Sequence, residues 1–214
     1  MKMKPLFSLF SMAVFTLVFT VAAYAAGPVQ LPNPQKEGGK PLMQALNDRM
    51  TSRAFSDQKL TPQVLSNLLW ATFGINRQDG RRTAPSAKNW QEIDIYVATP
   101  EAMYLWDHHK NVLNPVVEKD LRALTGTQPY VREAAVNLVY VADYSRVNAG
   151  GFDANMLVGA DTGFIAENAY LYCASEGLAT VIRAAIDRDA LGKELKLKPD
   201  QKIILSQSIG YPKK

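Results

Sequence analysis

Apolar residues along the chain first recur at the spacing of helices. One helix is predicted over Pro41–Met50, and a second begins at Pro62 behind Thr61, a pair typical of a helix N-terminus. The second helix is expected to run to about Thr72, with Gly74 ending it. Its apolar positions lie three and four residues apart and are Val64, Leu65, Leu68, Leu69 and Trp70.

The middle of the chain has the period of strands. Ile93, Ile95 and Val97 occupy alternate positions, which indicates a strand with two different faces. Thr99-Pro100-Glu101 then turns the chain into a second strand near Met103–Trp106. These two strands are predicted to form a hairpin.

Later segments return to helical spacing between further strands. Val116–Leu124 has the spacing of a helix, and the continuous apolar runs Val136–Ala142 and Ile203–Ile209 predict strands. The longest helix is predicted from about Asp161 to Glu176, with apolar residues on nearly all sides. Such a helix needs burial around most of its circumference, which a core or a subunit interface can supply. The sole cysteine, Cys173, lies in this helix and is expected to be a small buried hydrophobe.

The first residues have the pattern of a secretory signal peptide. Lys2 and Lys4 precede an almost wholly apolar run, Leu6–Ala23, and Ala23-Tyr24-Ala25 offers a small-x-small cleavage site. The alternative is an uncleaved membrane anchor, since this run approaches the ~20 residues that span a bilayer. We expect cleavage after about Ala25, export to the periplasm by the general pathway, and no stable membrane insertion afterwards.

The mature chain, residues 26–214, has the length of one domain with a sizeable core. Residues 26–40 contain several prolines and glycines with few large apolar residues and are predicted to be an extended arm, leaving 41–214 as the folded domain. The full sequence has 24 Lys and Arg against 20 Asp and Glu, a net charge of +4, and loss of Lys2 and Lys4 leaves +2. Charges of both signs alternate without a basic block, which argues against a nucleic-acid partner.

One short segment has the chemistry of a phosphate site. In Arg49-Met50-Thr51-Ser52-Arg53-Ala54-Phe55, two cations bracket two hydroxyls just after a helical run. Arginine offers a planar fork of donors to phosphate oxygens, and hydroxyls add neutral hydrogen bonds. The alternative is an ordinary solvated basic segment.

Other candidate chemistry in the chain is weak. Ser86 has no nearby general base, which argues against a serine hydrolase. Asp107-His108-His109 lacks the spacing and additional ligands of a metal site, so a solvated turn and no metal centre are predicted there.

Five motifs in order give the chain a resemblance to the flavin-dependent nitroreductase family, and within it to the azoline dehydrogenases of peptide-modifying clusters. They span roughly residues 46–212 and are R-x-T-x-R-x-F from Arg49, L-x-x-L-L-W-A-x-x-G-x-N-R from Leu65, R-T-A-P-S-A-x-N from Arg82, D-x-G-x-x-x-x-N from Asp161, and the terminal Gly210-Tyr211-Pro212. The resemblance implies an α+β, nitroreductase-like fold, with a mostly antiparallel central sheet flanked by helices in an intertwined homodimer. It also implies flavin mononucleotide (FMN) as the cofactor, bound at the dimer interface.

The resemblance assigns roles to individual residues. Arg49, Thr51 and Arg53 match the positions that hold the flavin phosphate and ribityl chain. Asn89 matches the amide that meets the pyrimidine edge of the flavin ring, where an amide supplies both donor and acceptor. The remaining matched positions are Pro85, Ser86 and Ala87 in the loop near the partner's flavin, Asn168 in the interfacial helix, Ile182, Arg183 and Ala184 in the segment passing flavin N5, and Lys213 as the terminal cation.

Three functions follow as hypotheses. The first is an exported FMN-dependent oxidoreductase that passes hydride through flavin N5 by a ping-pong mechanism, with NAD(P)H as one candidate donor. Its substrate would be a small organic molecule such as a nitroaromatic, a quinone or a heterocycle. The second is a flavin carrier of the same fold without turnover. The third is a structural protein whose Arg49 segment is only surface.

Overall fold

The computed structural model describes residues 27–214, so the predicted signal peptide lies outside the described residues. One seven-stranded sheet runs through the molecule in the order β1-β4-β3-β2-β5-β7-β6, and every neighbouring pair is antiparallel. The predicted antiparallel sheet and α+β class are therefore confirmed. The strands are β1 Val29–Gln30, β2 Ile93–Ala98, β3 Met103–Asp107, β4 Val112–Val117, β5 Val136–Asp143, β6 Ala179–Arg183 and β7 Gln201–Gly210.

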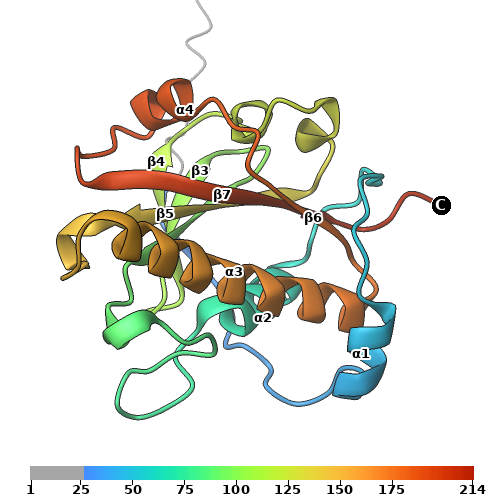
Figure 1. Cartoon of the computed structure of the whole chain (residues 1–214). Coiled ribbons are helices and arrows are strands. Elements are labelled where there is room, and N and C mark those ends of the chain that lie inside the picture. The colour runs from blue at the N-terminus through green and yellow to red at the C-terminus, as the bar shows by residue number, and fades with distance from the viewer. Residues whose placement is uncertain (1–26) are drawn as a thin grey trace, which may run out of the picture.

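Four α-helices flank the sheet. Figure 1 shows α2 and α3 against one face and α4 on the other, with α1 beside the C-terminal end of α3. Short 3₁₀ turns occupy residues 87–89, 122–125, 129–132 and 144–146. The α-helices are α1 Leu42–Asp48, α2 Pro62–Phe73, α3 Gly151–Glu176 and α4 Arg188–Glu194.

Alternation along the central strands separates two cores. In β2, Ile95 and Val97 pack with α2 and α3, whereas Tyr96 and Ala98 pack with Leu191 of α4 on the opposite face. Successive side chains of a strand point to opposite faces, so a strand covered on both sides is apolar at both sets of positions. This explains why β2 and β5 are almost wholly buried.

Local capping signals are borne out. The Thr61 hydroxyl accepts a hydrogen bond from the Val64 backbone N–H at 3.2 Å and caps α2, which Gly74 ends. In the predicted hairpin turn, the Thr99 hydroxyl accepts from the Glu101 backbone N–H at 3.1 Å. Cys173 is fully buried in the core beneath α3, and burial raises the pKa of its thiol.

Two predicted elements differ in the structure. Helix α3 begins at Gly151, ten residues before the predicted start. Its first turns are rich in weak helix formers, so the sequence did not indicate a helix there, and packing on the sheet stabilises these turns. No helix spans Val116–Leu124. Instead β4 pairs with β3 through Val117, and a 3₁₀ turn follows at Arg122–Thr125. Proline is tolerated at Pro115 because β1 pairs only with Val112 and Leu113, which leaves this part of β4 at the sheet edge.

None of the helices described in residues 27–214 has the length and apolar character needed to cross a membrane.

The packing of α2 predicts a stability effect. Leu69 is fully buried among sheet and α3 side chains, so Leu69→Ala should lower the free energy of unfolding by about 2–5 kcal/mol through lost burial and a cavity. Val116→Ala is the matched control, because Val116 is 38% exposed and a change within about 0.5 kcal/mol is expected. Denaturant unfolding measures both. Equal effects would contradict this description of the core.

Candidate functional site

A strained loop between α2 and β2 contains the first group of predicted residues. Lys88, Asn89 and Gln91 have φ angles of +51°, +57° and +49°, a left-handed conformation that non-glycine residues rarely adopt. Asparagine tolerates this region, but lysine and glutamine gain nothing from it. Each such residue costs of the order of 1–3 kcal/mol, and the surrounding structure must over-determine it. Strain of this kind concentrates at functional sites.

Two buried carboxyl groups hold the loop from beneath. Asp161 of α3 accepts a hydrogen bond from the Ala87 backbone N–H at 2.7 Å, and Glu92 accepts one from the Ser86 hydroxyl at 3.1 Å. Asp161 is 3% exposed and Glu92 is fully buried. Burial raises the pKa of both carboxyl groups, and the charge of Asp161 raises the pKa of Glu92 further. The other carboxyl oxygen of Glu92, Oε1, is buried without a hydrogen-bond partner among the described residues.

The Ser86 hydroxyl connects this pair to the strained backbone. It donates to Glu92 and accepts from the Gln91 backbone N–H at 2.8 Å, which closes the loop on itself. The Gln91 side chain then donates to the Asn89 side-chain oxygen at 3.0 Å. The predicted residues Ser86, Ala87 and Asn89 therefore lie in one hydrogen-bonded unit.

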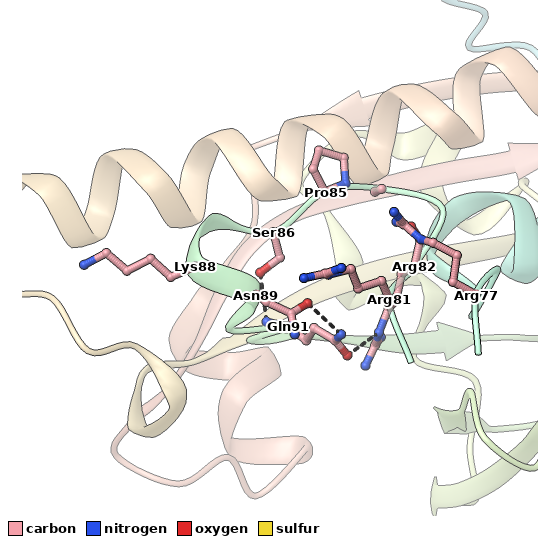
Figure 2. A pocket seen from close by; sticks show the side chains of 9 residues that line it. Arg77, Arg81, Arg82, Pro85, Ser86, Lys88, Asn89 and Gln91 are labelled. Carbon is pink, nitrogen blue, oxygen red and sulfur yellow. Dashed lines mark hydrogen bonds between the residues drawn. The ribbon is translucent and has the colours of Figure 1, made fainter. Parts of the chain in front are cut away.

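A cavity of about 440 Å³ opens beside this loop. Figure 2 shows the Arg81 side chain extending toward the Asn89 and Gln91 amides, and Arg82 hydrogen-bonded to Gln91. Four of its nine lining residues are cations, and none is acidic. The lining residues are Arg77, Arg81, Arg82, Ala84, Pro85, Ser86, Lys88, Asn89 and Gln91.

Arg82 forms the buried wall of the cavity. Its guanidinium donates to the Gln91 side-chain oxygen at 2.9 Å, lies 2.9 Å from His108 Nε2 and stands over the Phe73 ring. Burial lowers the pKa of Arg82 to about 10, so the side chain stays charged at neutral pH. Burial and the charge of Arg82 lower the pKa of His108 to about 4, which makes the neutral ring the acceptor. His108 and His109 lie in a turn, as predicted, but His108 is half-buried against Arg82 and only His109 is exposed.

A second cluster forms around Tyr170 near the C-terminal end of α3. The Tyr170 hydroxyl accepts a hydrogen bond from the Ile182 backbone N–H at 3.0 Å and lies 3.0 Å from the Thr51 hydroxyl. The Arg49 guanidinium stands over the Tyr170 ring at 5.4 Å. The backbone N–H of Ser52 also donates to the Thr180 carbonyl at 2.9 Å. The segment with phosphate chemistry is therefore fastened to β6.

The C-terminal residues join the same cluster. The Lys213 backbone N–H donates to the Ala54 carbonyl at 3.2 Å, and the Ser56 N–H donates to the Tyr211 carbonyl at 2.9 Å. The backbone at Lys213 thus lies next to the backbone at Ala54, the residue after Arg53. The side chains of Lys213 and Arg53 are both exposed. Two cations far apart in sequence are placed side by side at this end of the molecule.

The Arg183 side chain lies inside the protein. Its guanidinium is 7% exposed and donates to the Ser208 hydroxyl at 2.6 Å, the Thr125 hydroxyl at 2.8 Å and the Asn137 side-chain oxygen at 2.9 Å. Burial lowers the pKa of Arg183 to about 10. The side chain points into the protein, so any cofactor contact by this residue falls to its backbone. The sequence match located the segment and carried no information on this orientation.

The structure does not unite all predicted residues in one pocket of one chain. Ala184 is exposed beyond β6, and Asn168 is half-buried between the clusters, 3.4 Å from the Thr72 carbonyl. Asp161 and Tyr170, which hold the two clusters, are nine positions apart, about 13 Å along a helix axis. The predicted residues therefore form two separate groups along α3, which are called the two half-sites below.

Several residues of these half-sites were not identified from the sequence. Asp161, Arg77 and Arg82 are positions of the quoted motifs but were given no role, and Gln91 lies two residues beyond one of them. The sequence did not indicate a role for Tyr170, because an aromatic residue in an apolar helix is usually a core residue. In residues 27–214, no group of three or more His, Cys, Asp or Glu side chains is arranged to hold a metal ion.

Comparison with known proteins establishes the family. The nitroreductase family model matches residues 46–211. A proposed nitroreductase from Ralstonia eutropha JMP134 has a crystal structure similar to this one, with a TM-score of 0.84 and 39% identity over 90% of this chain and 93% of that chain. A proposed nitroreductase of Methanocaldococcus jannaschii is 27% identical over 181 residues, 79% of this chain and 90% of that protein.

A more distant structure shares the fold alone. The NADPH:FMN oxidoreductase of Vibrio harveyi, solved in complex with NAD⁺, has a TM-score of 0.62 and 20% identity over 81% of this chain and 69% of that one. Fold, motif order and family match agree. The chain belongs to the nitroreductase family, a family of oxidoreductases.

The buried carboxyl pair predicts a pH effect on stability. Because the folded-state pKa of Glu92 is raised, folding binds a proton above the usual carboxyl range, and wild-type stability should fall as pH rises from about 4.5. Glu92→Gln keeps the size of the side chain without a titrating proton, so its melting temperature should rise relative to wild type between pH 4.5 and 8. Glu133→Gln, at an exposed position, is the control. Parallel pH profiles for wild type and Glu92→Gln would contradict the raised pKa of Glu92.

Proposed function

We propose that this chain is an exported oxidoreductase that binds FMN and passes hydride through flavin N5 to or from a small organic substrate. The observation that carries the proposal is the convergence of three separate segments at the C-terminal half of α3. Arg49–Arg53, Ile182–Ala184 and Lys213 are joined there by the hydrogen bonds around Tyr170 and Ala54. These are the positions to which the family resemblance assigns the flavin phosphate, the N5 edge and the terminal cation.

The residues present fit a phosphate. Arg49, Arg53 and Lys213 offer cationic donors and Thr51 a hydroxyl, whereas Asp48 is held by Lys40 at 2.8 Å. Arginine donors with a flanking hydroxyl match phosphate oxygens in charge and geometry. The same cofactor appears in the name of the Vibrio harveyi relative. These features support FMN over a purely structural role for the segment.

The chain's own residues would position the flavin and shape its surroundings, and they would not themselves react. Flavin supplies the hydride chemistry when bound, and the protein orients it and sets its surroundings. Arg49, Arg53 and Lys213 would hold the phosphate, and the Asn89 amide would orient the pyrimidine edge. The ping-pong scheme needs no protein nucleophile, because one substrate leaves before the next occupies the same face.

The proposal includes a homodimer that completes each site. Exposed apolar side chains lie on α1, just after it and on the outer side of α3 at 45–79% exposure, namely Leu42, Met43, Leu46, Met50, Phe152, Met156 and Phe164. Large apolar side chains left this exposed support an interaction site on these two helices. A second copy packed there would bring its Pro85–Asn89 loop to the Tyr170 cluster, and the two half-sites would become one.

Export and the electron donor remain part of the proposal. Lys2, Lys4 and the apolar run before Ala23-Tyr24-Ala25 support a cleaved signal peptide and a periplasmic location. NAD(P)H is one candidate donor, although nicotinamides are scarce outside the cytoplasm, so another reductant fits export better. The R-T-A-P-S-A-x-N motif supports the azoline dehydrogenase branch, in which the substrate is a heterocycle.

The phosphate assignment predicts a loss of cofactor affinity. Arg53→Ala removes a charge-assisted contact of about 1.5–3 kcal/mol, so FMN affinity should fall roughly ten- to a hundredfold. Titration of FMN into apoprotein, followed by flavin fluorescence, measures this change. Lys193→Ala is the matched control, because Lys193 is exposed on α4 across the sheet and should leave affinity unchanged. Unchanged affinity in folded Arg53→Ala would make the cluster ordinary surface.

The dimer assignment predicts a mass change. Phe164 is 50% exposed on α3, so Phe164→Glu would place a charge in the proposed interface and should shift the protein from dimer to monomer in sedimentation. Flavin should be lost with the dimer, because each site needs the partner's loop. Val116→Glu, on the sheet edge, should stay dimeric. A wild-type monomer that retains FMN would overturn the shared site.

A further inference from the structure

The cavity beside the Asn89 loop is strongly basic. Arg77, Arg81, Arg82 and Lys88 line it without a single carboxylate. Like charges gathered around one concave surface repel one another, and a bound anion relieves that repulsion. Figure 2 shows the Lys88 side chain directed away from the three arginines, which leaves the arginines as the cationic wall.

Two of these arginines, Arg77 and Arg81, keep most of their positive charge available for a ligand. Arg77 donates only to neutral oxygens, the Asn76 side chain at 3.1 Å and the Arg82 carbonyl at 3.0 Å. Arg81 pairs with Asp79 at 2.9 Å, but the two side chains are 57% and 51% exposed, so water weakens this pair. Among the described residues, neither Arg77 nor Arg82 forms an ion pair.

The buried contacts keep this wall in place. Arg82 is locked by Gln91, His108 and the Phe73 ring, and Arg77 is fastened to the Arg82 carbonyl. The facing amides of Asn89 and Gln91 are fixed by the strained loop. Arg82, Asn89 and Gln91 are therefore in place before a ligand arrives, which limits the entropy lost on binding, whereas Arg77 and Arg81 are exposed at the rim.

We propose that this cavity binds the oxyanion of the substrate, a carboxylate or a phosphate, and so selects anionic organic substrates. Arginine forks match either group, and about 440 Å³ accommodates one ring with its anionic substituent. The inference rests on the proposed function, because Ser86 and Asn89 belong both to this cavity and to the loop assigned to the flavin edge. Arg77 and Arg81 are the specificity residues.

Three matched nitroaromatics test the selection: 4-nitrobenzoate, 4-nitrophenyl phosphate and the neutral 4-nitrobenzamide. In each turnover the reduced flavin gives two electrons as hydride, and one proton from water completes the conversion of nitro to nitroso and water. With flavin-loaded protein reduced by dithionite, kcat/KM for the anions should exceed that for the amide on the order of tenfold or more. The carboxylate and phosphate arms show which oxyanion the cavity prefers.

Arg77→Gln/Arg81→Gln should abolish this preference through KM while changing the amide's kcat/KM less than about twofold. Arg77→Lys/Arg81→Lys should retain part of it, because charge remains and the fork is lost. Lys193→Gln/Lys198→Gln removes the same charge from an exposed site across the sheet and should change nothing. Added salt should reduce the preference in wild type.

Calorimetric titration of 4-nitrobenzoate into oxidised protein gives a readout without turnover. Binding that is lost in Arg77→Gln/Arg81→Gln and kept in Lys193→Gln/Lys198→Gln supports the anion site, whether or not the protein turns over. If no acceptor reoxidises the flavin faster than free flavin, the proposed enzyme is wrong and the carrier is favoured, but this binding result still supports the anion site. Equal binding by wild type and Arg77→Gln/Arg81→Gln, or equal kcat/KM for anion and amide in an active wild type, overturns the anion site and leaves the proposed enzyme standing.

Discussion

The packing of α3 across one face of the sheet governs the arrangement of both half-sites. Its inner side is buried against β2, β5 and α2, and its polar residues at the edge of that contact hold the surrounding segments. Asp161 fastens the loop before β2, and Tyr170 fastens the Arg49 segment to β6. A shift of α3 by one turn would separate Asp161 and Tyr170 from their partners together. The site is thus set by one rigid element and not by independent loops.

The loop before β2 shows how the fold maintains an unfavourable backbone. Left-handed Lys88 and Gln91 would relax in a solvated loop, but the Ser86 hydroxyl and the Glu92–Asp161 pair bind the loop at both ends. Burying two carboxyl groups in this way is itself unfavourable, and it raises the pKa of both. The result is a rigid amide and arginine surface at the place where the family resemblance puts the ring edge. Rigidity there favours positioning, which is the protein's share of the chemistry in a flavin enzyme.

The outer side of α3 and the exposed side of α1 carry large apolar side chains that are open to solvent. Large apolar side chains such as Phe152 and Met43 are 79% and 76% exposed on the single chain, where burial would be favourable. The proposed second copy would cover them and join the half-sites about 13 Å apart along α3. A second copy on this surface would therefore both bury the exposed apolar side chains and bring the two half-sites together. The basic cavity lies beside the loop that Asp161 holds.

Local rules were sufficient for much of the fold. Thr61 and Gly74 mark α2 through capping chemistry, and the alternation of Ile93, Ile95 and Val97 marks β2, because both depend on neighbours in the chain. Motif order likewise located the Arg49 segment and the Asn89 loop. Contacts between distant residues were beyond those rules. Pairing with β3 made a strand of Val116, sheet packing extended α3 back to Gly151, and burial turned the Arg183 side chain inward. The Tyr170 junction joins residues 51, 170 and 182, which no sequence period relates, so their proximity arises from packing alone.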